Sequence, residues 1–164
     1  MVLKKISCIF LIISILGFLS LEAIENKHIL EIEKKIRILK LKPPNLVDYN
    51  YLEIPSINLK QIIISGITEE NLDKNYITTN DKITKNNNIT LAGHSIRSVF
   101  GKLHKIKLKD KIYINNIYEY EVIKKEIIID SETYKLSKNK DNINLLTCTL
   151  NNKKRLLVIA KLVD

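Results

Sequence analysis

The spacing of apolar residues divides the chain into three parts. Residues 6–21 form a run without a charge, slightly shorter than the roughly 20 residues of a typical membrane span. Apolar residues then recur every three or four positions between charged ones, as on one face of a helix: Ile29, Ile32, Ile36 and Leu39. From residue 46 onward, short β-branched runs alternate with turn residues. The pattern predicts an apolar N-terminal segment, a helical stalk and a β-rich domain.

Seven segments of the β-rich part have the character of strands. They are rich in isoleucine, valine, threonine and tyrosine, and they cover residues 51–57, 59–67, 88–94, 111–114, 117–129, 143–150 and 155–163. Asparagine tolerates left-handed backbone, so Asn115 and Asn116 predict a tight turn between the fourth and fifth segments. Short strands joined by turns at this density are typical of an all-β barrel or sandwich.

Two short helices and a polar loop complete the predicted domain. Residues 68–74 predict a helix that Thr68 caps, with two glutamates favouring the positive end of its dipole. Residues 98–106 predict another helix, with apolar residues on one face: Val99, Leu103 and Ile106. Residues 130–142 are polar and predict a loop.

Two segments are expected before the domain. The helical pattern stops at Pro43 and Pro44, because the residue before a proline disfavours helix. We therefore expect an N-terminal membrane anchor over residues 1–24, a stalk helix and linker over 25–45, and the domain over 46–164. His28, on the stalk, is expected to be solvated.

The apolar run also predicts where the domain lies. Lys4 and Lys5 precede the run, and basic residues on that side hold the N-terminus in the cytoplasm. An uncleaved anchor gives a single-pass protein of the cell membrane with an extracellular domain. A cleaved signal peptide is the alternative, although no clean small-x-small cleavage site follows the run. Both alternatives export residues 22–164.

Charge narrows the class of partner only a little. The chain has 27 Lys and Arg against 18 Asp and Glu, a formal net charge of +9. We expect no nucleic-acid partner, because the lysines are scattered and the sequence has no basic helix, zinc-ligand spacing or aromatic RNA-binding motif. Diffuse attraction to anionic lipid or wall polymer fits the same charge.

Export changes the meaning of the two cysteines. Cys8 lies inside the apolar run, so Cys148 is the sole thiol of the exported part, and a disulfide within that part is impossible. An unpaired exported thiol indicates reactivity or pairing with another molecule, and a buried, inert thiol is the alternative.

Three residues suggest chemistry. His94, Cys148 and Arg155 each lie at the edge of a predicted strand, and a hairpin would place Cys148 and Arg155 on adjacent strands. Each also has a plain structural explanation, as a strand-end histidine, a core thiol or a solvated strand start. His104 competes with His94; its lysine-rich surroundings predict a solvent-facing side chain, but spacing alone cannot choose between the two.

These residue types suit acyl transfer. A free thiol has a pKa of about 8.5, so only a few per cent is thiolate at neutral pH. A neighbouring imidazole can protonate the leaving group and, when charged, stabilise the thiolate. A guanidinium presents directed N–H donors to the oxyanion of a tetrahedral intermediate.

The ordered motifs resemble the sortase family. "GHSIRSVFGKLHKIKLKDKIYI", "YEYEV", "LLTCT" and "RLLVIAKL" follow one another in that family's order and spacing, and "IPSINLKQIIISGITEENL" is similar to its first two strands and helix. The resemblance covers roughly Tyr51 to Val163. It implies a mainly β fold, a closed barrel of about eight strands with short helices. Sortases are membrane-anchored cysteine transpeptidases of Gram-positive bacteria.

The resemblance also implies roles for single residues. Cys148 becomes the nucleophile, His94 the general acid and Arg155 the stabiliser of oxyanion and substrate. The implied substrate-binding residues are Ala92, Leu146 and Thr147. The implied reaction cleaves a Leu-Pro-x-Thr-Gly-like sorting signal of a surface protein and transfers the protein, through a thioacyl intermediate, to an amine of a peptidoglycan precursor or another wall acceptor. No cofactor and no metal is expected.

Three positions depart from the family pattern. Asn144 replaces the first threonine of the Thr-Leu-x-Thr-Cys signature, Lys109 stands where many relatives have glycine, and Lys74-Asn75 stands where a glycine is common. The motifs are most similar to class D or class A, and the lack of a C-terminal apolar segment disfavours class C.

Three other functions compete with this one. A cysteine peptidase or amidase of the envelope is the nearest, although papain-like and cell-wall peptidases place the cysteine before the histidine, whereas His94 precedes Cys148 here. L,D-transpeptidases need a Ser-His-Gly-Cys run, which this sequence lacks. A non-catalytic anchored β-module that binds anionic wall polymer is the alternative from another class.

Overall fold

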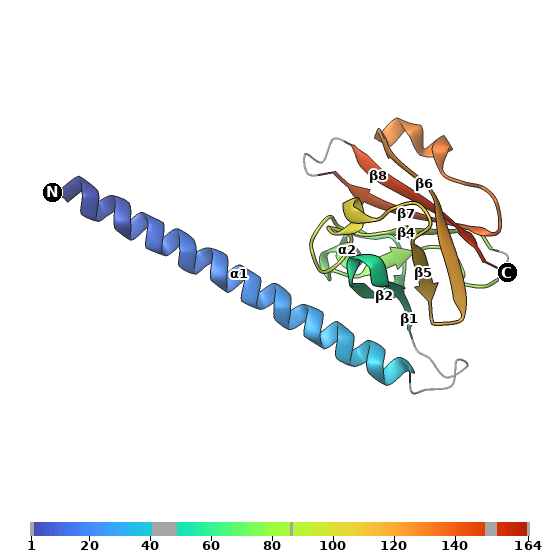
Figure 1. The fold of residues 1–164 in the computed structure, drawn as a ribbon, viewed down its shortest axis with the longest axis horizontal. Coiled ribbons are helices and arrows are strands. Elements are labelled where there is room, and N and C mark those ends of the chain that lie inside the picture. The colour runs from blue at the N-terminus through green and yellow to red at the C-terminus, as the bar shows by residue number, and fades with distance from the viewer. Residues whose placement is uncertain (1, 41–48, 86, 150–153, 164) are drawn as a thin grey trace.

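Eight strands close into a barrel next to a long N-terminal helix (Figure 1). The computed structural model describes residues 2–40, 49–85, 87–149 and 154–163. The helices are α1 (Val2–Lys40), α2 (Glu69–Asp73) and the 3₁₀ helices η2 (Pro55–Ile57), η3 (Leu103–Lys105) and η4 (Asp130–Lys135). The strands are β1 (Asn50–Ile54), β2 (Leu59–Ser65), β3 (Ile77–Thr79), β4 (Ile89–Ala92), β5 (Lys111–Ile114), β6 (Tyr118–Ile128), β7 (Asn142–Cys148) and β8 (Arg155–Leu162).

The order of strands around the barrel explains how distant segments meet. It runs β1-β2-β3-β4-β7-β8-β6-β5 and closes because β5 pairs with β1. The β4–β7 pair is parallel, whereas β7 and β8 are antiparallel. The sequence predicted every strand except β3, which has only three residues and so shows no alternation. Closure confirms the barrel and excludes the sandwich.

The barrel interior holds the main core. Alternate residues of β7 and β8 point inward, among them Ile143, Leu145, Val158 and Ala160, all fully buried. Phe100 and Tyr120 are the largest side chains inside. Burial raises the pKa of the Tyr120 hydroxyl to about 12.

Several turns use left-handed backbone without glycine. Asn115 and Asn116 have φ of 57° and 55°, which confirms the predicted tight turn between β5 and β6. Asn75 and Lys109, at two positions where the sequence departs from the family's glycine, have φ of 59° and 72°. The left-handed geometry is therefore kept at both, and Lys109 adopts it with a side chain that rarely does so.

Two predicted segments differ in local structure. Residues 98–106 form turns and the short helix η3 rather than one α-helix, yet the predicted apolar face of Val99, Leu103 and Ile106 is buried as expected. The polar segment 130–142 begins with η4 rather than with irregular loop.

α1 is one continuous helix whose N-terminal end projects beyond the barrel (Figure 1). Ile32 and Ile36 are only 2% exposed because they pack against Tyr51 and Ile62. His28 is half-buried, and its Nε2 is buried without a hydrogen-bond partner, so the expectation of a solvated side chain was wrong. The Pro43-Pro44 linker lies outside the described residues.

No helix in the described part of the chain is both long enough and apolar enough to cross a membrane. The anchor over residues 1–24 therefore stays a prediction.

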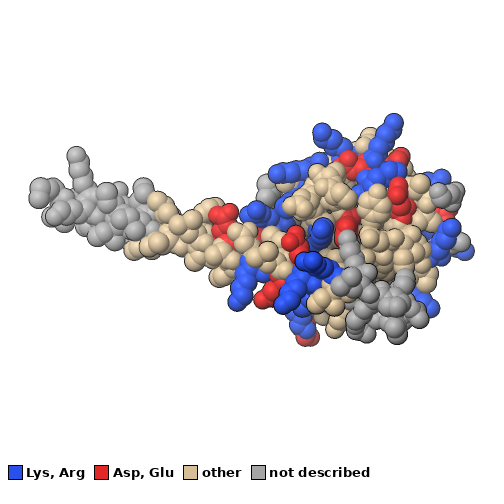
Figure 2. Space-filling view, turned by 60° about the horizontal axis from the view of Figure 1, so that its bottom comes forward, with Lys and Arg blue, Asp and Glu red and all other residues tan. Residues whose placement is uncertain are grey.

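Positive side chains are spread over the face of the molecule that Figure 2 shows. Figure 2 shows lysine and arginine side chains at several separate places on the visible face, with acidic side chains among them. This distribution agrees with the scattered lysines of the sequence and differs from a single basic patch.

Candidate active site

The β7–β8 hairpin places the thiol opposite the arginine. Cys148, the last residue of β7, is the register partner of Arg155, the first residue of β8. The Nη1 of Arg155 donates to the Sγ of Cys148 at 2.6 Å. The thiol is half-buried, so it is neither sealed in the core nor fully solvated. The predicted hairpin contact is confirmed, and the guanidinium lies directly on the sulfur. The connecting residues 150–153 lie outside the described part of the chain.

The other edge of the same guanidinium faces a carboxylate. The Nε of Arg155 lies 2.9 Å from Oδ1 of Asp130, and Nη2 lies 3.5 Å from Oδ2. Asp130 is the first residue of η4, two positions after Ile128, which pairs with Arg155 across β6 and β8. One arginine thus joins the sulfur to the η4 segment.

His94 follows β4 on the other side of β7. Ala92 of β4 is the register partner of Leu146 of β7, and the backbone N–H of Gly93 donates to the carbonyl of Leu146 at 3.2 Å. Because His94 and Cys148 each come two positions after this pair, their backbones lie at the same end of adjacent parallel strands. No hydrogen bond joins the two side chains among the described residues.

Gly93 lets the chain after β4 fold closely over the barrel end. A methyl group in its place would lie 2.7 Å from a side-chain carbon of Val99 and 2.9 Å from one of Phe100. The backbone N–H of Phe100 also donates to the carbonyl of His94 at 3.0 Å. These contacts fix the backbone of His94 through the segment that follows it.

The imidazole of His94 faces α2. Its Nε2 lies 3.6 Å from Oδ1 of Asp73, the last residue of that helix. About two fifths of the His94 side chain is exposed (41%) and Asp73 is more exposed still (78%), so the pair contributes little to stability.

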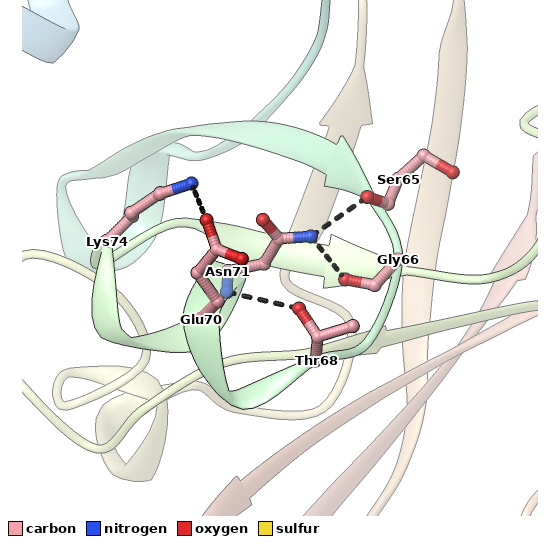
Figure 3. Close-up of polar contacts among 6 residues, drawn as sticks. All are labelled: Ser65, Gly66, Thr68, Glu70, Asn71 and Lys74. Carbon is pink, nitrogen blue, oxygen red and sulfur yellow. Dashed lines mark hydrogen bonds and ion pairs between the residues drawn. The ribbon is translucent and has the colours of Figure 1, made fainter.

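Side-chain hydrogen bonds hold α2 at the end of β2 (Figure 3). The Oγ1 of Thr68 accepts from the backbone N–H of Asn71 at 3.2 Å, which confirms the predicted cap. The amide of Asn71 donates to the carbonyls of Ser65 and Gly66 at 3.1 and 2.9 Å. An ion pair between Lys74 and Glu70 at 2.7 Å lowers the pKa of that glutamate. These contacts hold the helix whose last residue, Asp73, lies beside His94.

A cavity of about 960 Å³ opens beside the thiol. The segment after β4, β6 and the β7–β8 hairpin form its wall: Ser95, Phe100, Gly101, His104, Lys125, Glu126, Ile127, Thr147, Cys148, Thr149, Lys154 and Leu156. His104 is exposed, as predicted, but it lines this cavity, whereas His94 is not part of the wall. The Nδ1 of His104 lies 2.7 Å from the carbonyl oxygen of Gly101.

The three residues implied to bind substrate lie on two sides of the sheet. Ala92 and Leu146 are half-buried register partners, and Leu146 packs against the outer cluster of Ile128, Leu157 and Ile159. Thr147 alternates to the other side and lines the cavity. Its Oγ1 is buried and has no hydrogen-bond partner among the described residues.

Asn144, the departure from the family signature, is fully buried and highly connected. Its Oδ1 accepts from the backbone N–H of Ser137 at 2.8 Å, and its Nδ2 donates to the Ser137 carbonyl at 3.1 Å. Nδ2 also lies 3.3 Å from Oδ1 of Asn88 and 3.5 Å from Oγ1 of Thr90. The amide therefore ties the segment after η4 to β7 and β4.

Sequence reasoning missed both carboxylates of the site. Asp130 and Asp73 lie in segments read as a polar loop and a short surface helix, where an acid is ordinary. For Asp130, a signal was available in hindsight: it follows closely on the long strand β6, whose last residue, Ile128, pairs with Arg155. Among the described residues, no group of three or more metal-ligating side chains gathers.

The cysteine lies where β7 ends, the arginine where β8 begins and the histidine just after the adjacent strand β4, an arrangement that suits a cysteine-dependent acyl-transfer enzyme. The chain belongs to the sortase family, whose domain description matches residues 52–163. Sortases are cysteine transpeptidases.

Solved sortases of several classes are similar to the chain. Sortase A of Listeria monocytogenes is 29% identical, with a TM-score of 0.63 over 70% of this chain and 86% of its own. A sortase D5 transpeptidase of Clostridium perfringens is 27% identical, with a TM-score of 0.63 over 87% and 99%. Sortase C1 of Streptococcus agalactiae is 29% identical, with a TM-score of 0.59 over 70% and 67%. No match was found among curated protein sequences.

Proposed function

We propose that the protein cleaves a sorting signal similar to Leu-Pro-x-Thr-Gly between Thr and Gly and transfers the part that ends in the threonyl carbonyl to an amine of the cell wall. The observation that carries the proposal is the hydrogen bond from Arg155 to the sulfur of Cys148, which lines a cavity large enough for a peptide segment. The family makes a cysteine transpeptidase the expected activity, and this contact supports Cys148 as the sulfur that reacts.

In the first half-reaction the sulfur of Cys148 attacks the carbonyl carbon of the Thr–Gly bond. The thiol proton passes to His94, a C–S bond forms, the C–N bond breaks, and the leaving amine takes the proton from the imidazolium of His94. Arg155 donates to the oxygen that becomes negative in the intermediate. In the second half-reaction an acceptor amine attacks the thioester carbon, gives its proton to the imidazole and releases the sulfur.

Two features support the substrate sites. Ala92 and Leu146 form a half-buried apolar pair in line with Cys148, suited to apolar side chains of the signal. The unpartnered hydroxyl of Thr147 offers a hydrogen bond to the peptide near the sulfur. The acceptor is an amine, such as that of a peptidoglycan precursor.

We place the domain outside the cell, on a single N-terminal anchor. The uncharged run of residues 6–21 behind Lys4 and Lys5 supports this placement. Membrane fractionation of the full chain, with protease added from outside, tests it; a protein recovered in the soluble fraction would contradict the anchor.

The activity is tested with the full chain, a library of signal peptides and an amine acceptor. We expect transfer products from peptides of the Leu-Pro-x-Thr-Gly type, and none with Cys148→Ala, whose circular dichroism should match the wild type. Retained turnover in Cys148→Ala would refute the proposed function. Hydrolysis without transfer would identify a cysteine peptidase instead.

A further inference from the structure

The guanidinium of Arg155 is divided between two partners. Nη1 points at the sulfur of Cys148, whereas Nε and Nη2 face the carboxylate of Asp130. Since a guanidinium is planar and rigid, fixing the Nε edge also fixes the direction of Nη1. The carboxylate therefore determines where the donor at the sulfur points.

Stability alone does not explain this carboxylate. Asp130 is 65% exposed, and ion pairs of exposed groups are typically worth about 0–1 kcal/mol. Arginine carries roughly 2 kcal/mol of side-chain conformational entropy, so an unpaired Arg155 at the edge of the barrel would spread over several rotamers. A partner on a separate element removes that freedom before a substrate arrives.

The other acid of η4 makes different contacts. Glu132 pairs with Lys135 at 2.6 Å and accepts from the backbone N–H of Ile129 at 3.0 Å. The hydrogen bond from Lys135 and the one from Ile129 lower the pKa of the Glu132 carboxyl. Glu132 thus closes the helix on itself, and Asp130 is left to face Arg155.

We propose that Asp130 is a positioning residue, which holds the guanidinium of Arg155 with Nη1 directed at the sulfur that becomes acylated. The inference rests on the proposed function, because it assigns Asp130 to the oxyanion-stabilising arginine of that reaction. Asp130 itself touches neither sulfur nor substrate and acts through Arg155.

A double-mutant cycle tests the proposal on the full chain. The variants are Asp130→Asn, Asp130→Glu, Arg155→Ala and the double variant Asp130→Asn/Arg155→Ala, with Glu132→Gln as the matched control in the same helix. Two rates are measured: transfer of a signal peptide to an amine, and alkylation of Cys148 by iodoacetamide, followed on the peptide that contains Cys148 so that Cys8 does not interfere.

We expect Asp130→Asn to lower the transfer rate constant about tenfold, the size of a 1.4 kcal/mol effect, with little change in KM. Alkylation should slow at least threefold, because the donor at the sulfur is no longer held in place. Asp130→Glu should recover most of both rates, and Glu132→Gln should leave both within twofold of wild type. In the Arg155→Ala background, Asp130→Asn should change neither rate.

Each contrary result has one meaning. If the loss from Asp130→Asn persists in the Arg155→Ala background, Asp130 supports the loop rather than the arginine, and the proposal is overturned. Faster alkylation in Asp130→Asn would also overturn the proposal. The carboxylate of Asp130 would then act by weakening the positive field of Arg155 at the sulfur, rather than by positioning the guanidinium. Alkylation of Cys148 can show this coupling across the variants while the wild-type protein transfers no peptide. In that case the proposed function fails, and the coupling between Asp130 and Arg155 stands.

Discussion

At the scale of single residues, the sharpest question is which histidine supplies the proton. His94 comes just after the adjacent strand β4, at the same end as Cys148, but turns its Nε2 to Asp73, whereas His104 lines the cavity beside the thiol. We expect His94→Ala to lower the transfer rate about 10²–10⁴-fold, the usual contribution of general acid–base catalysis. His104→Ala should stay near the wild-type rate, because its Nδ1 is engaged by the carbonyl of Gly101.

The two histidine variants serve as controls for one another. Steady-state transfer of one signal peptide, measured side by side for both, decides the assignment. A large loss in His104→Ala with a small one in His94→Ala would move the general acid into the cavity wall.

Arg155 tests whether charge or directed bonding matters. A lysine keeps the charge but has a single nitrogen, which cannot meet both the sulfur and Asp130. We expect Arg155→Lys to lose about 10²–10³-fold in transfer rate, the typical cost of one oxyanion donor. The exposed Arg37→Lys on α1 is the matched control and should be neutral. Turnover near the wild-type rate in Arg155→Lys would show that positive charge alone, without directed hydrogen bonds, accounts for the role of Arg155.

At the scale of elements, Asn144 connects three of them. A threonine, the family's residue here, is too short to keep both hydrogen bonds to the Ser137 backbone. A buried group that loses its partner costs about 1–3 kcal/mol, so the free energy of unfolding of Asn144→Thr should fall by about that amount. Urea denaturation measures it, with the exposed Lys138→Ala of the same segment as control. An unchanged midpoint and slope would show that the amide network adds nothing.

Elements differed in how well the sequence predicted them. β6 and β8 are long and rich in β-branched residues, so the local pattern was enough to predict them. The positive φ of Asn115 and Asn116 follows from the asparagine side chain, so the turn was predicted too. β3 was missed because its three residues are held by pairing with β2 and β4, which no local pattern records. Likewise, Cys148 and Arg155 meet through a local hairpin, whereas Asp130 and Asp73 reach the site through tertiary folding.

At the scale of the whole molecule, α1 is part of the active-site surroundings. Besides packing through Ile32 and Ile36, the helix presents Glu25, whose Oε1 accepts from the backbone N–H of Ser98 at 3.0 Å. Glu22 lies 3.5 Å from Arg97. Both contacts reach the segment that follows His94.

Ile32→Ala should therefore release α1 while the barrel stays folded. Truncating a buried isoleucine to alanine typically costs about 2–5 kcal/mol of stability. Here the loss lowers the free energy with which α1 packs against the barrel. Hydrogen exchange should speed up in residues 25–38 and at the Ser98 amide, and remain slow in β7 and β8. Leu30→Ala, 65% exposed on the same helix, is the control and should leave exchange unchanged. Faster exchange throughout the barrel would show that helix and barrel unfold as one unit.

The barrel's strand order also sets a sequence of events during folding. The sulfur and the guanidinium meet through a local hairpin, the kind of unit that forms in about 1–10 μs. His94 is 54 positions from Cys148 (148 minus 94) and arrives only through the parallel β4–β7 pair, a non-local contact that forms slowly. We expect refolding chains to reach the native alkylation rate of Cys148 before transfer returns, an interval that pulsed alkylation measures against activity. For a time, a newly made chain would thus hold its thiol beside the arginine without the histidine that protonates the leaving amine. Closure of the barrel would then be the step that begins transfer activity.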